Sequence, residues 1–249
     1  MKPFFCIVLI AFLSYCGDEE DRQEIVNKLR GVGVKTTPSV FDKADVASLE
    51  SQMEILLLLP KDLKVTNIEN FKDPRSTFFL YTETQIDKDS ETYTDIGGLV
   101  LYSIKAKTTI PTVNDTLLDA FNGAASIRYG IKVAAGSDEE NIVGDLLFVK
   151  ENSPASLWKG KLPTITILDP NDDSPLTEKT TISITANIDK PIDDLYKINW
   201  FASGGKIKNF RSTKTTWELP EKGEHTLFVS VHGTRSKTFN YAYKKITVE

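Results

Sequence analysis

Residues 179–188 read KTTISITANI and alternate apolar with polar side chains. In an extended chain Ile182, Ile184, Ala186 and Ile188 share one face, and the polar side chains between them share the other. A strand with one buried and one solvated face is typical of an antiparallel sheet. The stretch therefore predicts a strand in an all-β, mainly antiparallel fold.

Short runs of the same kind surround this strand. Turn-forming residues separate them, including Gly204-Gly205 and the stretch 220–223, which reads PEKG. Close turn signals without a helical period are typical of a two-sheet sandwich. We expect a β-sandwich domain over residues 164–249, with strands at 164–168, 179–188, 195–201, 206–210, 213–219, 224–232 and 238–248.

The preceding residues, 27–150, predict a second β-sandwich domain. Its short apolar runs are also bounded by turn residues, which suits strands better than helices. Turn residues then dominate 151–163, which predicts a linker between the two domains. The strands expected in the first domain are 29–36, 53–59, 76–81, 97–107, 127–134 and 142–149.

One segment of the first domain has a helical pattern. Residues 115–121 read DTLLDAF, with Asn114 or Asp115 available to cap the start and Gly123 to end the helix. Residues 42–52 fit a helix or a strand equally well. The fold class is therefore all-β, with two sandwiches and at most one short helix in the first.

Three stretches of the second domain resemble a known family: 200–205 (WFASGG), 217–220 (WELP) and 223–227 (GEHTL). They are similar to the Ig-like and PKD-like repeats of bacterial surface proteins, in which a buried tryptophan precedes a turn. The acidic and aromatic run of the PKD signature is missing at 201–203, so the resemblance favours the generic Ig-like type. It implies an Ig-like sandwich over 164–249 and no particular ligand.

The first residues of the chain have the order of an export signal. Lys2 precedes an apolar run over 3–15, and Cys16 is followed by the acidic stretch 18–21. As a helix the apolar run would measure roughly 20 Å, which is shorter than the bilayer core of about 30 Å. This length favours the apolar part of a signal peptide over a membrane-spanning helix.

The same segment resembles bacterial lipoprotein signals, which are cut before a cysteine that then carries acyl chains. The resemblance implies a signal peptide over 1–15, lipidation of Cys16 and an acidic tether over 16–26. Tyr15 departs from the family's usual small residue, and a conventional cleaved signal or an uncleaved N-terminal anchor is the alternative. Gly17 stands where enteric bacteria place the aspartate that retains lipoproteins at the inner membrane, which implies the outer membrane.

Composition excludes several classes of function. The formal net charge of −5 argues against a nucleic-acid partner. Both cysteines, Cys6 and Cys16, lie in the signal region, which leaves no pair for an internal disulfide and no Cys-ligated zinc site. The two histidines, His225 and His232, lie seven residues apart in one expected strand and so point to opposite faces. Without a recognisable catalytic or phosphate-binding motif, we expect no enzyme and no cofactor.

Acidic residues in two loops are candidate calcium ligands. Asp169, Asp172 and Asp173 are close enough in sequence to surround one ion, and Asp189, Asp193 and Asp194 lie on another loop. The sequence lacks the glycine and the distal glutamate of an EF-hand. Solvated Asx turns explain the same composition, and we favour that interpretation.

Two further groups are candidate binding surfaces. A basic group near Phe210 could contact an anionic glycan or peptide, although protection of an edge strand explains it as well. An aromatic row on the last strand could stack on sugar rings, although core or cross-strand packing is commoner. The residues are Lys206, Lys208, Arg211 and Lys214 in the basic group, and Phe239, Tyr241 and Tyr243 in the row.

These features together predict a lipid-anchored, non-enzymatic protein of the bacterial envelope that acts as a binding or adhesion module. Its membrane contact would be the lipid anchor, and its partner a protein or a glycan. A structural spacer in a periplasmic or surface assembly is the alternative. A third hypothesis is an accessory subunit or enzyme with a site in the first domain.

Overall fold

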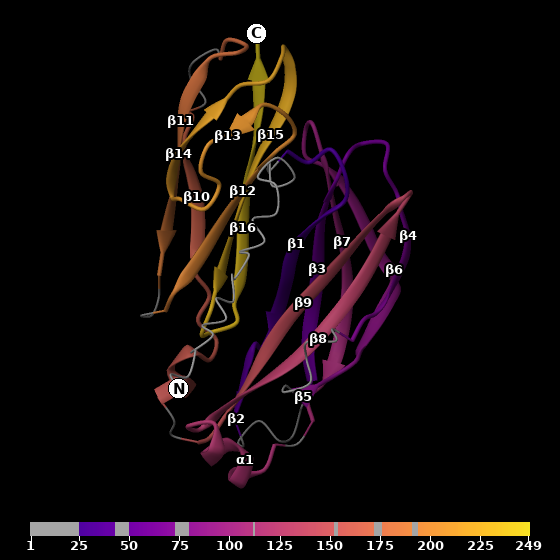
Figure 1. Ribbon diagram of the computed structural model, residues 1–249, viewed down its shortest axis with the longest axis vertical. Helices are drawn as coiled ribbons and strands as arrows, with labels where there is room; N and C mark the ends of the chain where they lie inside the picture. Colours follow the sequence, from indigo (N-terminus) through magenta and orange to yellow (C-terminus); the bar gives the residue numbers. More distant parts are fainter. Residues whose placement is uncertain are drawn as a thin grey trace, which may run out of the picture.

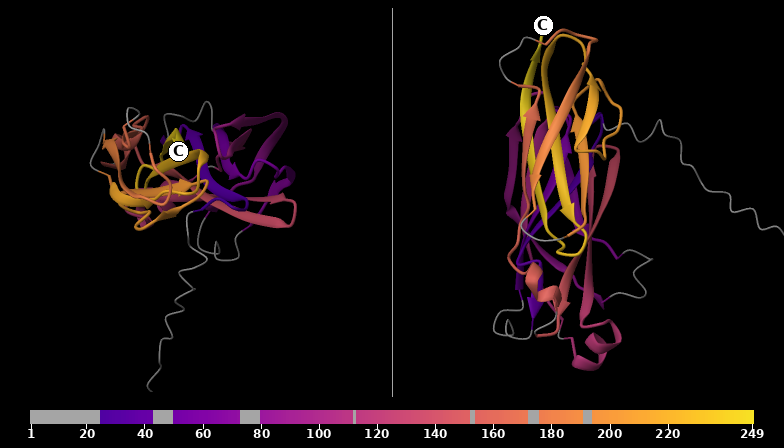
Figure 2. Two further views of the ribbon diagram at one scale, coloured as in Figure 1. Left: turned by 90° about the horizontal axis from the view of Figure 1, so that it is seen from above. Right: turned by 90° about the vertical axis from the view of Figure 1, so that its left-hand side faces the viewer.

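The computed structural model describes residues 25–42, 50–72, 80–111, 113–151, 154–171, 176–190 and 194–249. Nearly all of this part is strand, in two β-sandwiches that lie side by side (Figure 1, Figure 2). The predicted all-β fold with two sandwiches and one short helix is confirmed for the described residues. The predicted signal peptide, Cys16 and all but the end of the predicted tether lie outside them.

The first sandwich is built from residues 30–149. One sheet has the order β1-β3-β7-β6, and the other has the order β2-β9-β8-β4 with β5 also paired to β8. The described pairs are antiparallel except for the short β2–β9 and β5–β8 pairs. The strands are β1 (Arg30–Thr37), β2 (Val40–Asp42), β3 (Glu50–Leu59), β4 (Val65–Asn70), β5 (Leu80–Tyr81), β6 (Thr84–Asp95), β7 (Val100–Thr109), β8 (Ala124–Ala135) and β9 (Asp138–Val149).

The helix of the first sandwich forms where the sequence predicts it. α1 (Asp115–Ala120) begins after Asn114, whose side chain accepts a hydrogen bond of 2.8 Å from the backbone N–H of Leu117. This bond satisfies one of the N–H groups that a helix start leaves without a partner. Gly123 follows the helix with a φ of +83°, a backbone conformation that glycine adopts without strain.

The second sandwich has sheets of order β10-β11-β14-β13 and β12-β15-β16. Lettered A to G in chain order, these are the ABED and CFG sheets of a constant-type immunoglobulin fold. All seven expected strands are present, although β13 is shorter than predicted. They are β10 (Thr164–Asp169), β11 (Thr181–Asp189), β12 (Tyr196–Ala202), β13 (Lys206–Ile207), β14 (Lys214–Glu218), β15 (Gly223–Gly233) and β16 (Phe239–Val248).

Two tryptophans occupy the core of this second sandwich. Trp200 on β12 and Trp217 on β14 are both fully buried. Their indole N–H groups donate hydrogen bonds to the carbonyls of Ser212 at 2.8 Å and Gly204 at 3.0 Å. The predicted apolar face of β11 also packs into this core, as does Ile198 on β12. Since no cysteine lies in these strands, packing takes the place of the disulfide of antibody domains.

The first sandwich has the same topology, which the sequence did not reveal. β1, β3, β7 and β6 take the places of strands A, B, E and D, and β9, β8 and β4 those of G, F and C. Three of its strands, β2, β4 and β6, were not predicted. β6 reads TQIDKDSETYTD and has little apolar periodicity, because it is the edge strand of its sheet.

Apolar side chains join the two sandwiches. They come from the outer face of the β1-β3-β7-β6 sheet and the outer face of the β12-β15-β16 sheet, which pack against each other. The four sheets are therefore stacked with three apolar layers between them. We call the middle layer the interface cluster: Val26, Val32, Leu56, Leu58, Ile96, Leu99, Leu101, Phe201, Phe228, Phe239 and the half-buried Tyr241.

The interface cluster explains why two strands are apolar on both faces. On β3, Ile55 and Leu57 face the core of the first sandwich, while Leu56 and Leu58 face the second sandwich. On β15, Val229 faces its own core and Phe228 faces the first sandwich. Strands covered on both sides have continuous apolar runs rather than alternating ones.

A close backbone approach supplements this packing. The turn between β6 and β7 lies against β12 and β15, where a Cβ added to Gly98 would fall 2.4 Å from the Oγ of Ser203. Any larger residue at position 98 would therefore push the two sandwiches apart at this point.

Both segments outside the sandwiches contact them. Val26, at the end of the predicted tether, is 3% exposed, and its N–H donates to the carbonyl of Ala202 at 2.9 Å. In the predicted linker a 3₁₀ helix, Pro154–Trp158, places Trp158 against Val40 and Leu147. Among the described helices, none has the length and apolar character needed to cross a membrane.

Candidate functional site

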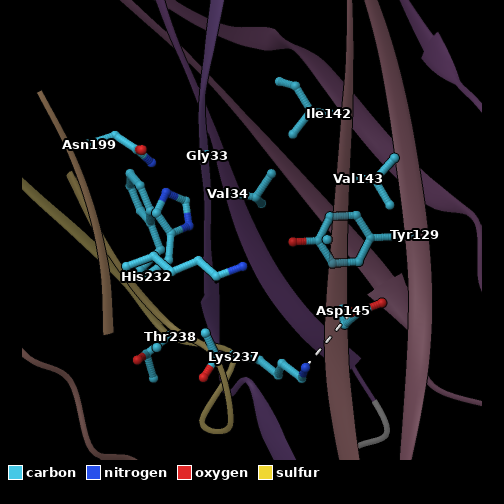
Figure 3. A pocket seen from close by; sticks show the side chains of 15 residues that line it. Gly33, Val34, Tyr129, Ile142, Val143, Asp145, Asn199, His232, Lys237 and Thr238 are labelled. Carbon is cyan, nitrogen blue, oxygen red and sulfur yellow. Dashed lines mark ion pairs between the residues drawn. The ribbon is translucent and has the colours of Figure 1, made fainter. Parts of the chain in front are cut away.

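A cleft of about 430 Å³ opens between the two sandwiches, beside the interface cluster (Figure 3). Its size falls within the range of small-ligand sites. Strands β1, β8 and β9 form one wall, and β12, β15 and the turn into β16 form the other. Both sandwiches therefore contribute to the cleft, and neither forms it alone.

The hydroxyl of Tyr129 reaches the cleft from the core of the first sandwich. The tyrosine on β8 is paired across the ladder with Gly144 on β9, and a Cβ at position 144 would fall 2.2 Å from its Oη. The missing side chain at Gly144 thus makes room for the phenol, which points into the cleft (Figure 3). Among the described residues the hydroxyl has no hydrogen-bond partner, although the side chain is only 3% exposed.

The environment keeps the Tyr129 hydroxyl protonated. Burial, and after it the nearby carboxylate of Asp145, raises the pKa of Tyr129 above its ordinary value. The phenol is therefore a neutral hydrogen-bond donor at physiological pH. The hydroxyl faces the open cleft rather than the closed core, so it is free to donate to a ligand acceptor there.

His232 forms the inner end of the second wall. Its ring lies edge-on to Phe239, with 4.7 Å between the centroids, and faces β1 at Gly33. Burial lowers its pKa to about 4, a backbone hydrogen bond with Val32 acts in the opposite direction, and the charge of Lys197 lowers it further. The imidazole is therefore neutral at pH 7 and adds no charge to the cleft.

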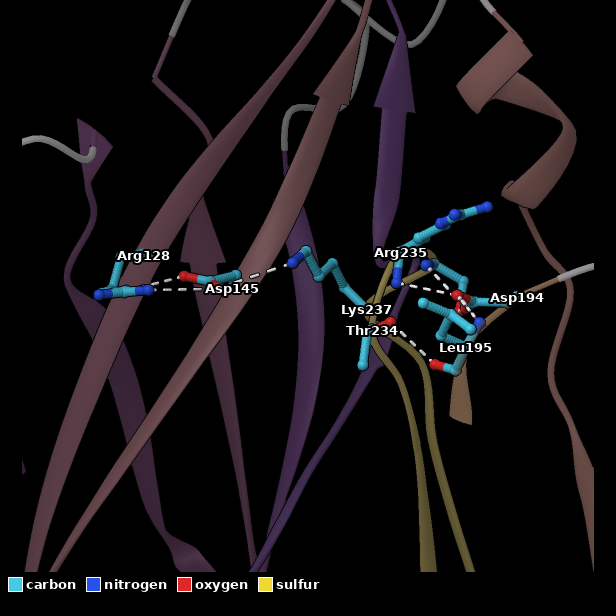
Figure 4. A network of polar contacts seen from close by, with 8 residues as sticks. Arg128, Asp145, Asp194, Leu195, Thr234, Arg235 and Lys237 are labelled. Carbon is cyan, nitrogen blue, oxygen red and sulfur yellow. Dashed lines mark hydrogen bonds and ion pairs between the residues drawn. The ribbon is translucent and has the colours of Figure 1, made fainter. Parts of the chain in front are cut away.

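A chain of charges crosses the mouth of the cleft (Figure 4). Arg128 on β8 donates to Asp145 on β9 at 2.9 Å, and the ammonium group of Lys237 lies 3.8 Å from the same carboxylate. Lys237 belongs to the turn between β15 and β16, so this contact joins the two sandwiches. Arg128 already neutralises Asp145, which leaves Lys237 as a surplus positive charge.

Two further polar groups line the second wall without a partner among the described residues. Lys197 and Asn199 alternate with the core residues of β12 and so face the cleft. Neither side chain forms a hydrogen bond or an ion pair with a described residue. With Lys197 and Lys237 opposite one paired carboxylate, the lining carries a surplus of positive charge and of hydrogen-bond donors.

The acidic loops have a different arrangement from a calcium site. Asp194 is 4% exposed, and its carboxylate accepts from the N–H groups of Leu195, Arg235 and Ser236 and from the hydroxyl of Ser236 (Figure 4). This carboxylate therefore holds the turn after β15 in place.

The other acidic candidates lie at the ends of strands or outside the described residues. Asp169 and Asp189 lie at the exposed ends of β10 and β11, and Asp172, Asp173 and Asp193 lie outside the described residues. Within the described ranges, no three His, Cys, Asp or Glu side chains come close enough together to hold a metal ion.

The two histidines lie on opposite faces of β15, as the sequence predicts. His225 is near the start of the strand, where its Nδ1 lies 3.2 Å from the Oγ of Ser203 and its Nε2 lies 2.8 Å from the carbonyl of Glu221. His232 faces the first sandwich at the other end of the strand. The structure does not bring the two rings together.

The two candidate binding surfaces, the aromatic row and the basic group, differ in their exposure. In the aromatic row, Phe239 is buried and Tyr241 half-buried in the interface cluster, while Tyr243 is 41% exposed. Packing therefore explains the first two members. The basic group is exposed along β13, β14 and the turn between them, and β13 is the edge strand of its sheet, as the protective interpretation requires.

Comparison with known proteins supports the fold of the second sandwich. Residues 163–229 match the family described as "Bacterial Ig domain". The second sandwich is Ig-like. The match covers less than half of the chain, and a search of curated proteins finds no match.

Solved structures with Ig-like or fibronectin-like modules are similar in outline. The fibronectin(III)-like modules of Clostridium thermocellum CbhA align with 14% identity and a TM-score of 0.34, covering 89% of this chain and 94% of theirs. The D00-D0 domain of intimin aligns with 10% identity and a TM-score of 0.25, covering 89% of this chain and 98% of its own. Three N-terminal domains of the bacteriophage RB49 outer capsid protein Hoc align with 12% identity and a TM-score of 0.25, covering 88% of this chain and 59% of theirs.

Sequence reasoning missed the cleft. Its residues come from positions between 33 and 239, and no local pattern joins them. Gly144 inside the run 142–149 was the one available signal, because a glycine inside a strand often marks a close approach.

Proposed function

We propose that the chain is a lipid-anchored, non-enzymatic protein of the bacterial envelope, and that its two sandwiches act together as one binding module. The N-terminal sequence supports the anchor, because a short apolar run precedes Cys16 and an acidic stretch follows it. By resemblance to lipoproteins that lack an inner-membrane retention signal, the proposal places it at the outer membrane.

The interface cluster is the observation that carries the binding role. Inter-domain contacts within a chain are usually small and polar, and they permit relative motion. Here aromatic and aliphatic side chains from both sandwiches are buried together, and Phe228 is fully buried. The cleft walls are therefore held at a fixed spacing, and a preformed site loses less entropy on binding.

The fused sandwiches also suit the alternative role of a spacer, because a stiff pair of domains keeps a fixed length. The cleft favours binding instead, because a spacer has no use for a cleft lined by polar side chains, among them the Tyr129 hydroxyl and Lys197, that form no hydrogen bond with a described residue.

Cell fractionation tests the anchor. We expect Cys16→Ser to move the protein from the membrane fraction to the soluble fraction, since the acyl chains contribute about 0.8 kcal/mol per buried methylene. Cys6→Ser is the matched control, because it removes the other cysteine and leaves the acyl acceptor. Retention of the Cys16→Ser protein in the membrane fraction would contradict lipidation.

Sedimentation with isolated envelopes tests the binding role. A purified chain beginning at Asp18 has no acyl acceptor, so any envelope binding must come from the folded part. We expect saturable co-sedimentation. Absence of binding to envelopes and to their solubilised extract would favour the spacer.

A further inference from the structure

The cleft has a lining that selects for one kind of ligand. Its lining includes the ammonium groups of Lys197 and Lys237, and the nearby carboxylate of Asp145 is already paired with Arg128 and Lys237, so positive charge is in surplus. A ligand that fits must supply acceptor oxygens and a negative charge.

We propose that this cleft binds a carboxylate-bearing sugar residue of an acidic glycan, with Lys197 and the hydroxyl of Tyr129 as its main contacts. The inference rests on the proposed binding function and names the site and the ligand class. Lys197 supplies the charge that a carboxylate requires and has no ion pair with a described residue. The Tyr129 hydroxyl supplies a neutral donor, which is held in position by the core around its ring.

The rest of the lining suits a sugar. Asn199, whose side chain forms no hydrogen bond with a described residue, offers amide donors and an amide acceptor, which match ring hydroxyls. Val34, Ile142 and Val143 give the opposite wall an apolar surface, against which the C–H face of a ring can pack (Figure 3). A volume of about 430 Å³ accepts a small part of a chain, and the opening to solvent lets the glycan continue outward.

The geometry also explains why both sandwiches are needed. Tyr129 belongs to the first and Lys197 to the second, so the two contacts keep their spacing only while the interface cluster is intact. The site therefore exists only because the two sandwiches pack against each other, and it would be absent from either sandwich on its own.

Titration calorimetry with an oligosaccharide of galacturonic acid tests the proposal. The methyl-esterified oligosaccharide is the control without charge. A triglutamate peptide is the control that carries carboxylates on a peptide backbone instead of on sugar rings. We expect the acid form to bind and both comparison ligands to bind at least about tenfold more weakly, since a hydrogen bond to a charged group contributes about 1.5–3 kcal/mol.

Two variants locate the binding. Lys197→Gln and Tyr129→Phe should each weaken binding about tenfold while leaving the melting temperature almost unchanged, because Lys197 is exposed and the phenylalanine ring still fills the core. Lys208→Gln removes the same charge from the exposed basic group and should have no effect.

Several results would overturn the proposal. Equal binding of the methyl ester would exclude the carboxylate contact, and equal binding of triglutamate would exclude selection for a sugar. An equal effect of Lys208→Gln would indicate diffuse attraction rather than a site. If the acid oligosaccharide does not bind while the chain still sediments with envelopes, the cleft assignment fails and the binding function stands. If neither interaction occurs, both fail.

Discussion

The hydroxyl of Thr226 donates a hydrogen bond of 2.6 Å to the carbonyl of Ile96, although 130 residues separate them in the chain. Thr226 lies on β15 of the second sandwich, and Ile96 lies in the turn after β6 of the first. Both residues are fully buried, so the bond is shielded from water. It fixes the end of one sandwich against the other, next to the apolar interface cluster.

Phe228→Ala should destabilise the whole chain by about 3–5 kcal/mol, because it opens a cavity in the interface cluster. The ring is fully buried, stacks on Tyr241 at 5.2 Å between centroids and meets Phe201 edge-on at 6.1 Å. Urea unfolding followed by circular dichroism measures the change. Phe121→Ala is the control, because that ring is 52% exposed and should cost less than about 0.5 kcal/mol. A similar cost for both variants would contradict a packed interface.

The two sandwiches should unfold in one transition. Trp200 and Trp217 lie in the core of the second sandwich, whereas Trp158 packs against Val40 and Leu147 of the first. In a Trp158→Phe background, tryptophan fluorescence therefore reports on the second sandwich. Far-ultraviolet circular dichroism reports on both sandwiches. Because the interface cluster couples them, the two probes should give the same midpoint. Two separated midpoints would mean that the sandwiches unfold independently.

Trp200→Ala should cost about 3–5 kcal/mol and Trp200→Phe less, since phenylalanine keeps most of the buried ring. The indole is fully buried and donates to the carbonyl of Ser212, which the alanine variant would leave without its partner. Both variants remove the indole N–H, so the difference between their denaturant midpoints measures the contribution of the buried ring volume. A loss below about 1 kcal/mol for the alanine variant would contradict burial.

Stability should fall as the pH is lowered from about 6.5 to about 4. Burial lowers the folded-state pKa of His232 to about 4, so over this interval the unfolded chain binds a proton that the folded chain does not. The contribution of this residue is complete above the unfolded pKa, is lost through the interval and amounts to at most about 3 kcal/mol. Urea midpoints measured across this range should be less pH-dependent in His232→Gln than in the parent. An unchanged pH profile in the variant would exclude His232 as the cause.

Alternation along the chain was enough to predict most of the second sandwich. Ile184 and Ala186 on β11 lie on the predicted apolar face, and Trp200 on β12 is buried as the resemblance to Ig-like repeats implies. The exception is β13, which ends at Ile207 because the following residues form a turn. There the N–H of Asn209 donates to the side-chain hydroxyl of Thr215 on β14 instead of to a backbone carbonyl of that strand.

The edge strands of the first sandwich could not be predicted in the same way. β6 is mostly polar, and backbone hydrogen bonds to β7 hold it in the sheet. Backbone pairing leaves no mark on side-chain periodicity, so a polar edge strand and a loop have similar sequences. The candidate site could not be predicted from the sequence either, because Tyr129 and Lys197 lie far apart in the chain and line the same cleft only in the folded protein.

The amino-acid sequence alone determined the all-β class, the apolar face of β11 and the place of the one helix, with its cap at Asn114 or Asp115, because each depends on neighbours within a few residues. Only the tertiary structure shows that the two sandwiches pack against each other through the interface cluster and that a cleft lies between them. Leu56 and Phe228 are apolar on strands whose other faces already fill a core, and such residues do not specify which surface will cover them. That choice depends on the shapes of two whole sheets, which exist only once both sandwiches have formed.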